Sequence, residues 1–277
     1  MNGNAPSVEG VGSARTSSNA SAAAACVVVL GALLGLQPAA GKQFDAKWRA
    51  CEIGAVATMH VQIEACTEII AKGGQSPQRL AIAHFNRGWA YNLGGRHDRA
   101  IDDFGKAIRF EPDSANAFRS RGDAYRRKKM LTPAIVDFNR AIALKPDYAG
   151  AFSDRGAAYY ALGRRIEALA DFDHAIALLP DVAEPYLLRA QVLARSGDFA
   201  GAVRDLDRAI AIEASDGQAY AARGYAHLAL KRPELALFDF KAALRLRPDL
   251  ATARRGLKQA TKAAPALRPT IANMAGP

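Results

Sequence analysis

Acidic residues spaced two apart are the first feature of this 277-residue chain that suggests chemistry. Asp171 with Asp173, and Asp205 with Asp207, have the residue type that holds divalent cations. On a helix, however, side chains two residues apart point in different directions, so neither pair can converge on one ion. The histidines are dispersed along the chain: His60, His84, His97, His174 and His227. We therefore expect no metal site.

Motifs of catalytic machinery are absent from the sequence. It contains no GxSxG, no GxxxxGK[ST] phosphate loop, no HExxH and no GxGxxG that opens a βαβ unit. Each of these motifs places a nucleophile, phosphate-binding amides or metal ligands at a fixed spacing. We therefore predict a non-catalytic protein that uses no cofactor.

Residues 120–130 read SRGDAYRRKKM and suggest other functions. Arg121, Gly122 and Asp123 spell the tripeptide of cell-adhesion ligands. The basic run at residues 126–129 has the composition of a nuclear address or of a patch that binds nucleic acid. The sequence around the stretch has to decide between these interpretations.

Two cysteines follow the N-terminal region, Cys51 and Cys66. We expect two helices around them, with the turn near residues 58–60, so that the cysteines are almost equidistant from the turn. Such residues face each other in an antiparallel helix hairpin, so a disulfide is predicted. The alternative is a pair of buried free thiols. A zinc site is not expected, because no second Cys or His pair accompanies them.

The first 43 residues differ in composition from the rest. Residues 2–21 are rich in Gly, Ser, Asn and Ala, which is typical of disorder. Residues 22–36 form an uncharged apolar run, and the small residues of QPAAG follow it. We predict an export signal that is cleaved near Ala40 or Gly41, and hence a periplasmic or secreted protein. The alternatives are a membrane anchor at residues 22–36 or a cytoplasmic protein with an Ala-rich tail.

The net charge of the chain is +10. A basic chain tends to bind acidic partners, anionic surfaces or nucleic acid. Lys and Arg are nevertheless interspersed with Asp and Glu throughout, so the sequence shows no single basic block. We therefore consider nucleic-acid binding unlikely and expect a solvated surface of mixed charge.

A repeat of 34 residues dominates the sequence. Five copies follow one another without a gap, at residues 81–114, 115–148, 149–182, 183–216 and 217–250. Position eight is Gly88, Gly122, Gly156, Ala190 and Gly224; position 24 is Phe104, Phe138, Phe172, Leu206 and Phe240; position 32 is Pro112, Pro146, Pro180, Ala214 and Pro248. Ala occupies positions 20 and 27 in all five copies.

Each copy predicts a helix hairpin. A first apolar run with helical spacing ends at a turn that often contains Gly, and a second run follows until Pro ends it. Small residues at positions eight, 20 and 27 allow two backbones to approach closely. The Phe at position 24 then fills the space between neighbouring hairpins.

This pattern of aromatic, Arg-Gly, Tyr, Ala, Phe, Ala and Pro resembles the tetratricopeptide repeat. Together with the export signal expected at the N-terminus, it suggests an exported bacterial member of that family. The resemblance implies an all-α fold, a right-handed superhelical α-solenoid of helix-turn-helix units. We expect a degenerate hairpin at residues 44–80, the five repeats at 81–250, a capping helix at 251–264 and a flexible tail at 265–277. The Arg-Gly-Asp spelling then falls inside a helix, where no adhesion ligand would lie, and residues 128 and 129 fall at a turn.

Position seven departs from the family pattern, because it is Arg where the family usually has Leu. Asp recurs at position 23. We interpret these residues as repeated charge-assisted pairs within a hairpin or between neighbouring hairpins. The pairs involve Arg87, Arg121, Arg155, Arg189 and Arg223, with Asp103, Asp137, Asp171, Asp205 and Asp239.

The resemblance also implies a concave surface lined by the first helix of each hairpin. Positions two, five, six, nine, twelve and thirteen form one stripe on that helix. The candidate groove residues are Phe85, Asn86, Trp89, Asn92, Arg119, Asp123, Arg126, Arg127, Asp154, Tyr160, Gln191 and Tyr225. The Lys and Asn with which some family members hold a terminal carboxylate are missing, so that ligand is not expected here.

The sequence thus predicts a scaffold that binds another protein, as a peptide or a helix, in this groove. We expect an acidic segment of the partner to face the arginines of the second repeat. The alternatives are an anionic polymer, nucleic acid or membrane bound to the basic surface, and self-assembly by stacking of end units. The N-terminal segment leaves membrane attachment open, and the oligomeric state is not predicted.

Overall fold

The computed structural model describes residues 46–52 and 58–264. The expected signal or anchor at residues 22–36 and the expected tail at 265–277 lie outside these residues. Over the described ranges, no helix is both long and apolar enough to cross a membrane.

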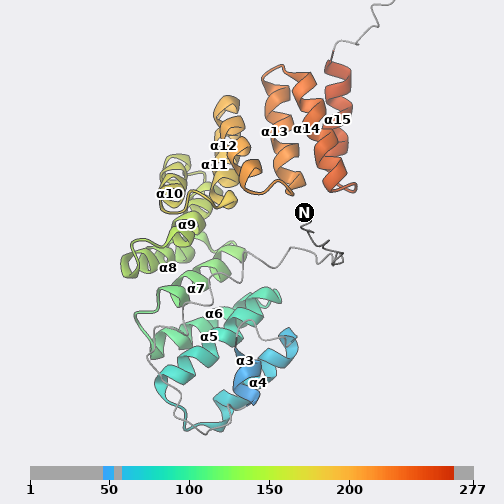
Figure 1. The fold of residues 1–277 in the computed structure, drawn as a ribbon. Coiled ribbons are helices and arrows are strands. Elements are labelled where there is room, and N and C mark those ends of the chain that lie inside the picture. The colour runs from blue at the N-terminus through green and yellow to red at the C-terminus, as the bar shows by residue number, and fades with distance from the viewer. Residues whose placement is uncertain (1–45, 53–57, 265–277) are drawn as a thin grey trace, which may run out of the picture.

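The described residues form helices and no strand, which confirms the predicted all-α solenoid (Figure 1). The front hairpin is α3 (Ala46–Cys51) and α4 (Met59–Lys72). The repeats follow as α5 (Pro77–Leu93) with α6 (His97–Phe110), α7 (Ala115–Arg127) with α8 (Leu131–Leu144), α9 (Ala149–Ala161) with α10 (Arg165–Leu178), α11 (Ala183–Arg195) with α12 (Phe199–Ile212), and α13 (Gly217–Ala229) with α14 (Pro233–Leu246). The last described helix is α15 (Ala251–Ala263).

The turn inside each of the five repeats contains one residue with left-handed backbone geometry. Position fifteen has φ of 72°, 78° and 86° at Gly95, Gly163 and Gly197, where the absence of a Cβ makes this conformation inexpensive. In the second and fifth repeats the same position is Lys129, with φ of 64°, and Lys231, with φ of 59°. These two lysines are therefore held in a left-handed conformation that is unfavourable for any residue with a Cβ.

In four of the five repeats, the core is built from one aromatic ring and the glycine that faces it. Phe104, Phe138, Phe172 and Phe240 are fully buried, and each contributes about 2–3 kcal/mol of hydrophobic stabilisation. A Cβ added at the facing glycine would meet the ring at 3.1 Å or less, and at 2.7 Å for Gly122 against Phe138. A larger residue at position eight therefore requires a smaller one at position 24.

The fourth repeat makes this exchange. It has Ala190 at position eight and Leu206 at position 24, and both are buried in one cluster. The two departures from the repeat pattern are thus explained by a single constraint on volume.

The front hairpin is joined at its cysteines. Cys51 and Cys66 are buried, and the structure pairs them with a Cα–Cα distance of 4.9 Å. The expected facing geometry is therefore present. Formation of the bond in the cell stays a prediction.

The hairpins follow one another from α3 and α4 at one end to α13, α14 and α15 at the other (Figure 1). First helices approach each other directly in the pairs α5 and α7, α7 and α9, α9 and α11, and α13 and α15. Successive second helices make no comparable contact among the described residues. Because the first helices lie closer together, they form the concave side of the array.

Candidate partner-binding groove

The predicted Arg and Asp residues form an ion pair inside every repeat. Arg121 donates from Nε and Nη2 to the two oxygens of Asp137, both at 2.8 Å, and the other four repeats have the same two-bond geometry. The aspartates are buried, with Asp103 and Asp239 only 1% exposed. A planar guanidinium satisfies both carboxylate oxygens, which an ammonium could not do with the same geometry.

The same arginines also reach back to the preceding unit. Nη1 of Arg155 donates to Asn139 at 2.6 Å, Nη1 of Arg189 to Asp173 at 2.5 Å, and Nη1 of Arg223 to Asp207 at 2.6 Å. Arg87 makes the equivalent bond to Thr67 of the front hairpin at 3.0 Å. We call this set of bonds from position seven the arginine ladder.

The arginine ladder explains the carboxylates that are spaced two apart. Asp171 binds Arg155 of its own repeat, whereas Asp173 binds Arg189 of the next one. The two side chains therefore diverge, as expected, and each has a separate arginine. These inter-repeat acceptors were not predicted from the sequence, although position 25 is Asn or Asp in three repeats.

The pKa of Asp103 follows from this environment. Burial alone would raise the pKa of its carboxyl, but hydrogen bonds from Arg87 and His84 outweigh that effect and lower it below the usual value. His84 Nδ1 lies 2.9 Å from Asp103 Oδ1, and Arg87 Nε lies 2.8 Å from Oδ2. The carboxylate is therefore charged in the fold at neutral pH.

The concave stripe is where successive first helices bind each other. Asn92 on α5 donates to Asp123 on α7 at 3.0 Å, and Arg119 on α7 donates to Asp154 on α9 at 2.7 Å. Farther along, the Tyr225 hydroxyl on α13 donates to the carbonyl of Thr252 on α15 at 2.9 Å. The predicted positions thus lie together on one side of the solenoid.

The groove arginines of the second repeat, Arg119, Arg126 and Arg127, do not present free positive charge. Asp123 accepts from Arg126 at 2.6 Å and from Arg127 at 2.7 Å, and Asp154 accepts from Arg119. Burial raises the pKa of Asp123, but Arg127, Arg126 and Asn92 outweigh it, so the pKa is lowered overall.

Three carboxylates share the centre of the groove with these three arginines. Glu184 on α11 lies within electrostatic range of Asp154 and Arg119 and is the third of them. The centre of the groove in the second repeat therefore offers no excess positive charge to an acidic partner, contrary to the interpretation drawn from its sequence.

The other predicted groove residues differ in exposure. Phe85 and Trp89 are half-buried against the core of the first repeat, and the Phe85 ring lies 5.6 Å from that of Phe104. Tyr160 packs in the same way in the third repeat, and Asn86 is buried. Gln191 is exposed on α11 and free to meet a partner.

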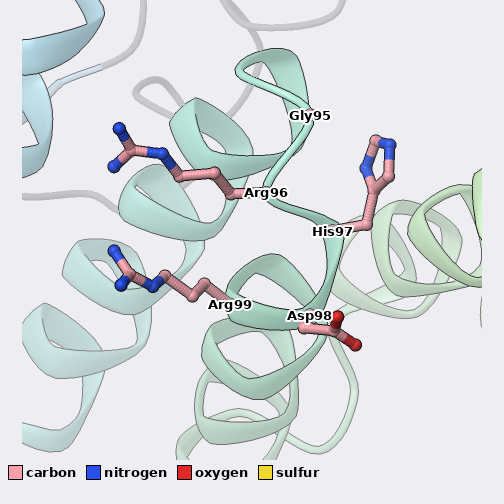
Figure 2. Close-up of a pocket in the computed structure, with 5 residues that line it drawn as sticks. All are labelled: Gly95, Arg96, His97, Asp98 and Arg99. Atoms are coloured by element: carbon pink, nitrogen blue, oxygen red, sulfur yellow. The ribbon is translucent and has the colours of Figure 1, made fainter.

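A pocket of about 470 Å³ lies at the turn between α5 and α6. Figure 2 shows Arg96 and Arg99 extending to one side of the turn, and His97 and Asp98 to the other. Both arginines lie over the Tyr91 ring, while His97 binds Asn92 at 2.8 Å. The side chains therefore diverge, and the pocket does not gather them into a site.

The adhesion tripeptide lies inside α7, where Arg121 is held by Asp137 and Asp123 by Arg126 and Arg127. Both charges are engaged within the fold and neither is at a loop tip.

Models of the tetratricopeptide repeat family match the chain in several places. One described as "Tetratricopeptide repeat" matches residues 81–114, another of the same description matches 153–217 and 187–251, and one described as "TPR repeat" matches 122–163. These matches together cover more than half of the chain. No curated protein matches it significantly.

Solved structures resemble the fold. YrrB, "a TPR protein with an unusual peptide-binding site", is 21% identical with a TM-score of 0.54, and the match covers 71% of this chain and 99% of YrrB. A thermophilic TPR protein from Thermus thermophilus, TTC0263, is 23% identical with a TM-score of 0.55, covering 66% of this chain and 99% of that one. The Cut9-Hcn1 structure gives a TM-score of 0.64 at 17% identity, covering 73% and 39%. At these identities the likeness shows the fold alone.

The repeat register, the helix hairpins and these matches define the class of protein as a helical repeat solenoid. The chain belongs to the tetratricopeptide repeat family. Its fold and family support a protein–protein interaction scaffold, and members of the family are typically non-catalytic.

Proposed function

We propose that the chain binds an extended segment or a helix of another protein along its concave face. One observation carries this proposal: stripe residues bond α5 to α7, α7 to α9 and α13 to α15, so the predicted positions line the inner side of the array. That face presents exposed side chains, including Gln191, Gln218 and Ala222, and also carries the half-buried rings of Trp89 and Tyr225. Polar and aromatic groups on one face suit a peptide.

The arginine ladder supports a preformed groove. Ion pairs inside each repeat and bonds from one unit to the preceding one fix the angle between neighbouring hairpins. A groove held in this way needs little rearrangement when it binds, so less ordering entropy opposes association. The peptide-binding site named for YrrB shows that this fold accommodates such a ligand in another protein.

Photo-crosslinking from two matched alanines tests the proposal. Ala222 is exposed on the concave stripe of α13, and Ala170 is exposed on the second helix α10. Benzoylphenylalanine at Ala222 is expected to capture a discrete protein partner in cells, whereas the same probe at Ala170 should not. Equal capture at both positions, or capture at Ala170 alone, would place the binding surface elsewhere.

We also propose that the chain is exported. The uncharged run at residues 22–36 and the facing cysteines of the front hairpin support this location. Cell fractionation combined with N-terminal sequencing should find the mature chain starting near residue 41 in the periplasm or medium. A cytosolic chain with an intact N-terminus and reduced cysteines would contradict it.

A further inference from the structure

The positive charge of this chain is concentrated at one end of the solenoid. Residues 240–263 contain seven basic side chains and one acidic side chain, Asp249, in a chain whose net charge is +10. The seven are Lys241, Arg245, Arg247, Arg254, Arg255, Lys258 and Lys262, and all are exposed. Within the described part of the chain, none of them forms a salt bridge, in contrast to the paired arginines of the second repeat.

Four of these side chains form a stripe on α15. Arg254, Lys258 and Lys262 follow one another at four-residue spacing, which places them about 6 Å apart along the helix axis. Arg255 lies beside them. Ala253, Gly256 and Ala260 form the opposite, buried face, which packs against the last repeat. We call the exposed stripe the basic end face.

The repeat register explains why this face is free. In a regular repeat, position four lies against the second helix of its own hairpin, as Phe152 does against His174 with ring centroids 5.2 Å apart. Position eight is the small residue that faces the aromatic ring. On α15 these positions are Arg254 and Lys258, so a second helix of the repeat type could not pack there.

The basic end face is continuous with the groove. Arg255 and Lys262 occupy positions five and twelve of the repeat register, which belong to the concave stripe. The adjacent stripe residue Thr252 is already joined to Tyr225 of α13. A partner that follows the groove past the exposed Arg195 toward its C-terminal end therefore meets a cluster of uncompensated positive charge on reaching α15.

We infer that the basic end face binds an acidic segment of the partner polypeptide. This inference rests on the proposed function, because the segment is taken to belong to the protein that occupies the groove. Alternate residues of an extended chain lie about 6.7 Å apart, so alternating carboxylates match the spacing of the basic stripe. Charge complementarity then sets the direction in which the partner lies along the groove.

Two other anionic partners fit this surface less well. The sequence of α15, ATARRGLKQATKA, has no aromatic residue on which a nucleic acid base could stack. Its apolar face is buried against the last repeat, so the helix has no apolar surface to insert into a bilayer. An acidic polypeptide requires neither feature.

Binding of a synthetic acidic peptide to the full chain tests the inference. The probe is a fluorescein-labelled peptide in which Glu alternates with Ala, and its anisotropy is measured at low and high salt. The triple variant Arg255→Glu, Lys258→Glu, Lys262→Glu should bind it roughly tenfold or more weakly, because three exposed ion pairs are replaced by repulsion. High salt should weaken binding to the unaltered chain as well.

A matched variant separates local charge from net charge. Arg109→Glu, Arg165→Glu, Arg204→Glu makes the same change in net charge at exposed sites on second helices, and its affinity should stay within about twofold of the unaltered chain. Circular dichroism checks that both variants are folded. Equal losses in the two variants, or no loss in either, would overturn the inference.

The remaining outcomes are equally decisive. If single-stranded DNA or vesicles of phosphatidylglycerol bind the basic end face more tightly than the peptide does, the surface does not select a polypeptide and the inference fails. If the Ala222 crosslink fails but the peptide still binds, only the proposed binding of a partner along the groove is rejected. The opposite pattern, a crosslink at Ala222 with no peptide binding, rejects only the role of α15.

Discussion

Gly105 interrupts the arginine ladder, and filling it should stabilise the protein. Position 25 supplies the acceptor that receives Nη1 of the next arginine at Asn139, Asp173 and Asp207, but in the first repeat it is Gly105. A Cβ added there would lie 3.7 Å from Nη1 of Arg121, an ordinary contact. An asparagine side chain thus fits and can accept the missing bond.

The expected gain for Gly105→Asn has two parts. Replacing Gly by Asn inside α6 gains about 0.3 kcal/mol of helix propensity. The half-exposed hydrogen bond to the arginine adds about 1 kcal/mol, after allowance for solvent screening. The total is about 1.3 kcal/mol in the free energy of unfolding.

Gly105→Ala is the control for this prediction, because it gains about 0.9 kcal/mol from propensity alone and supplies no acceptor. Urea unfolding followed by circular dichroism, with a shared m-value, measures both variants. The asparagine variant should equal or exceed the alanine variant. If it is instead less stable by the propensity difference of about 0.6 kcal/mol, the bond to the preceding unit contributes nothing.

Four further predictions follow from the same structure. Gly122→Ala should lower the free energy of unfolding by about 1–3 kcal/mol, because its methyl group would lie 2.7 Å from the Phe138 ring. Adding Phe138→Leu should recover part of this loss, as the Ala190 and Leu206 pair of the fourth repeat indicates. A double-mutant cycle in urea measures the coupling, and strictly additive effects would contradict it. Lys129→Gly should raise the melting temperature by relieving a positive φ of 64°, a gain of about 1 kcal/mol, whereas Lys128→Gly, where φ is −77°, should not. Because the pKa of Asp103 is lowered in the fold, its contribution to stability is present above the unfolded pKa near 4 and is lost as the pH falls through the folded value. Asp103→Asn should therefore be less stable at pH 7, and its stability should fall less steeply as the pH is lowered. An unchanged acid dependence in urea unfolding at several pH values would refute this. Reducing the Cys51–Cys66 bond, which closes a loop of 15 residues, should cost roughly 3 kcal/mol for the front hairpin, measured by urea unfolding with and without dithiothreitol, and Cys51→Ser should abolish the response.

Much of the fold could be predicted because its determinants are local. Gly at position eight, Phe at position 24 and Pro at position 32 stand at fixed offsets in the repeat, and their recurrence shows the register directly. The Arg and Asp pairs were predictable for the same reason, since Arg121 and Asp137 stand 16 residues apart in a single repeat. The Asp-x-Asp spacing could not be explained within a single repeat, because Asp173 accepts a hydrogen bond from Arg189 of the following repeat.

The groove shows more clearly what could not be predicted from the sequence. Its position follows from the register, but its charge does not, because Arg119 finds its carboxylate 35 residues away on the next first helix. Composition suggested a basic centre in the second repeat. Pairing within α7 and between α7 and α9 neutralises that centre, whereas the exposed basic side chains of α15 form no salt bridge.

The sequence by itself determined the repeating hairpins, the family and the face on which a partner is expected, because side-chain periodicity and turn chemistry operate over a few residues. The tertiary structure alone decided which charges are free. An ion pair depends on which atoms meet when hairpins stack, and stacking brings together residues of different repeats at distances that no local pattern records. The sequence shows that arginines are abundant, and the structure shows that the groove arginines of the second repeat are matched by carboxylates while the arginines of α15 are not.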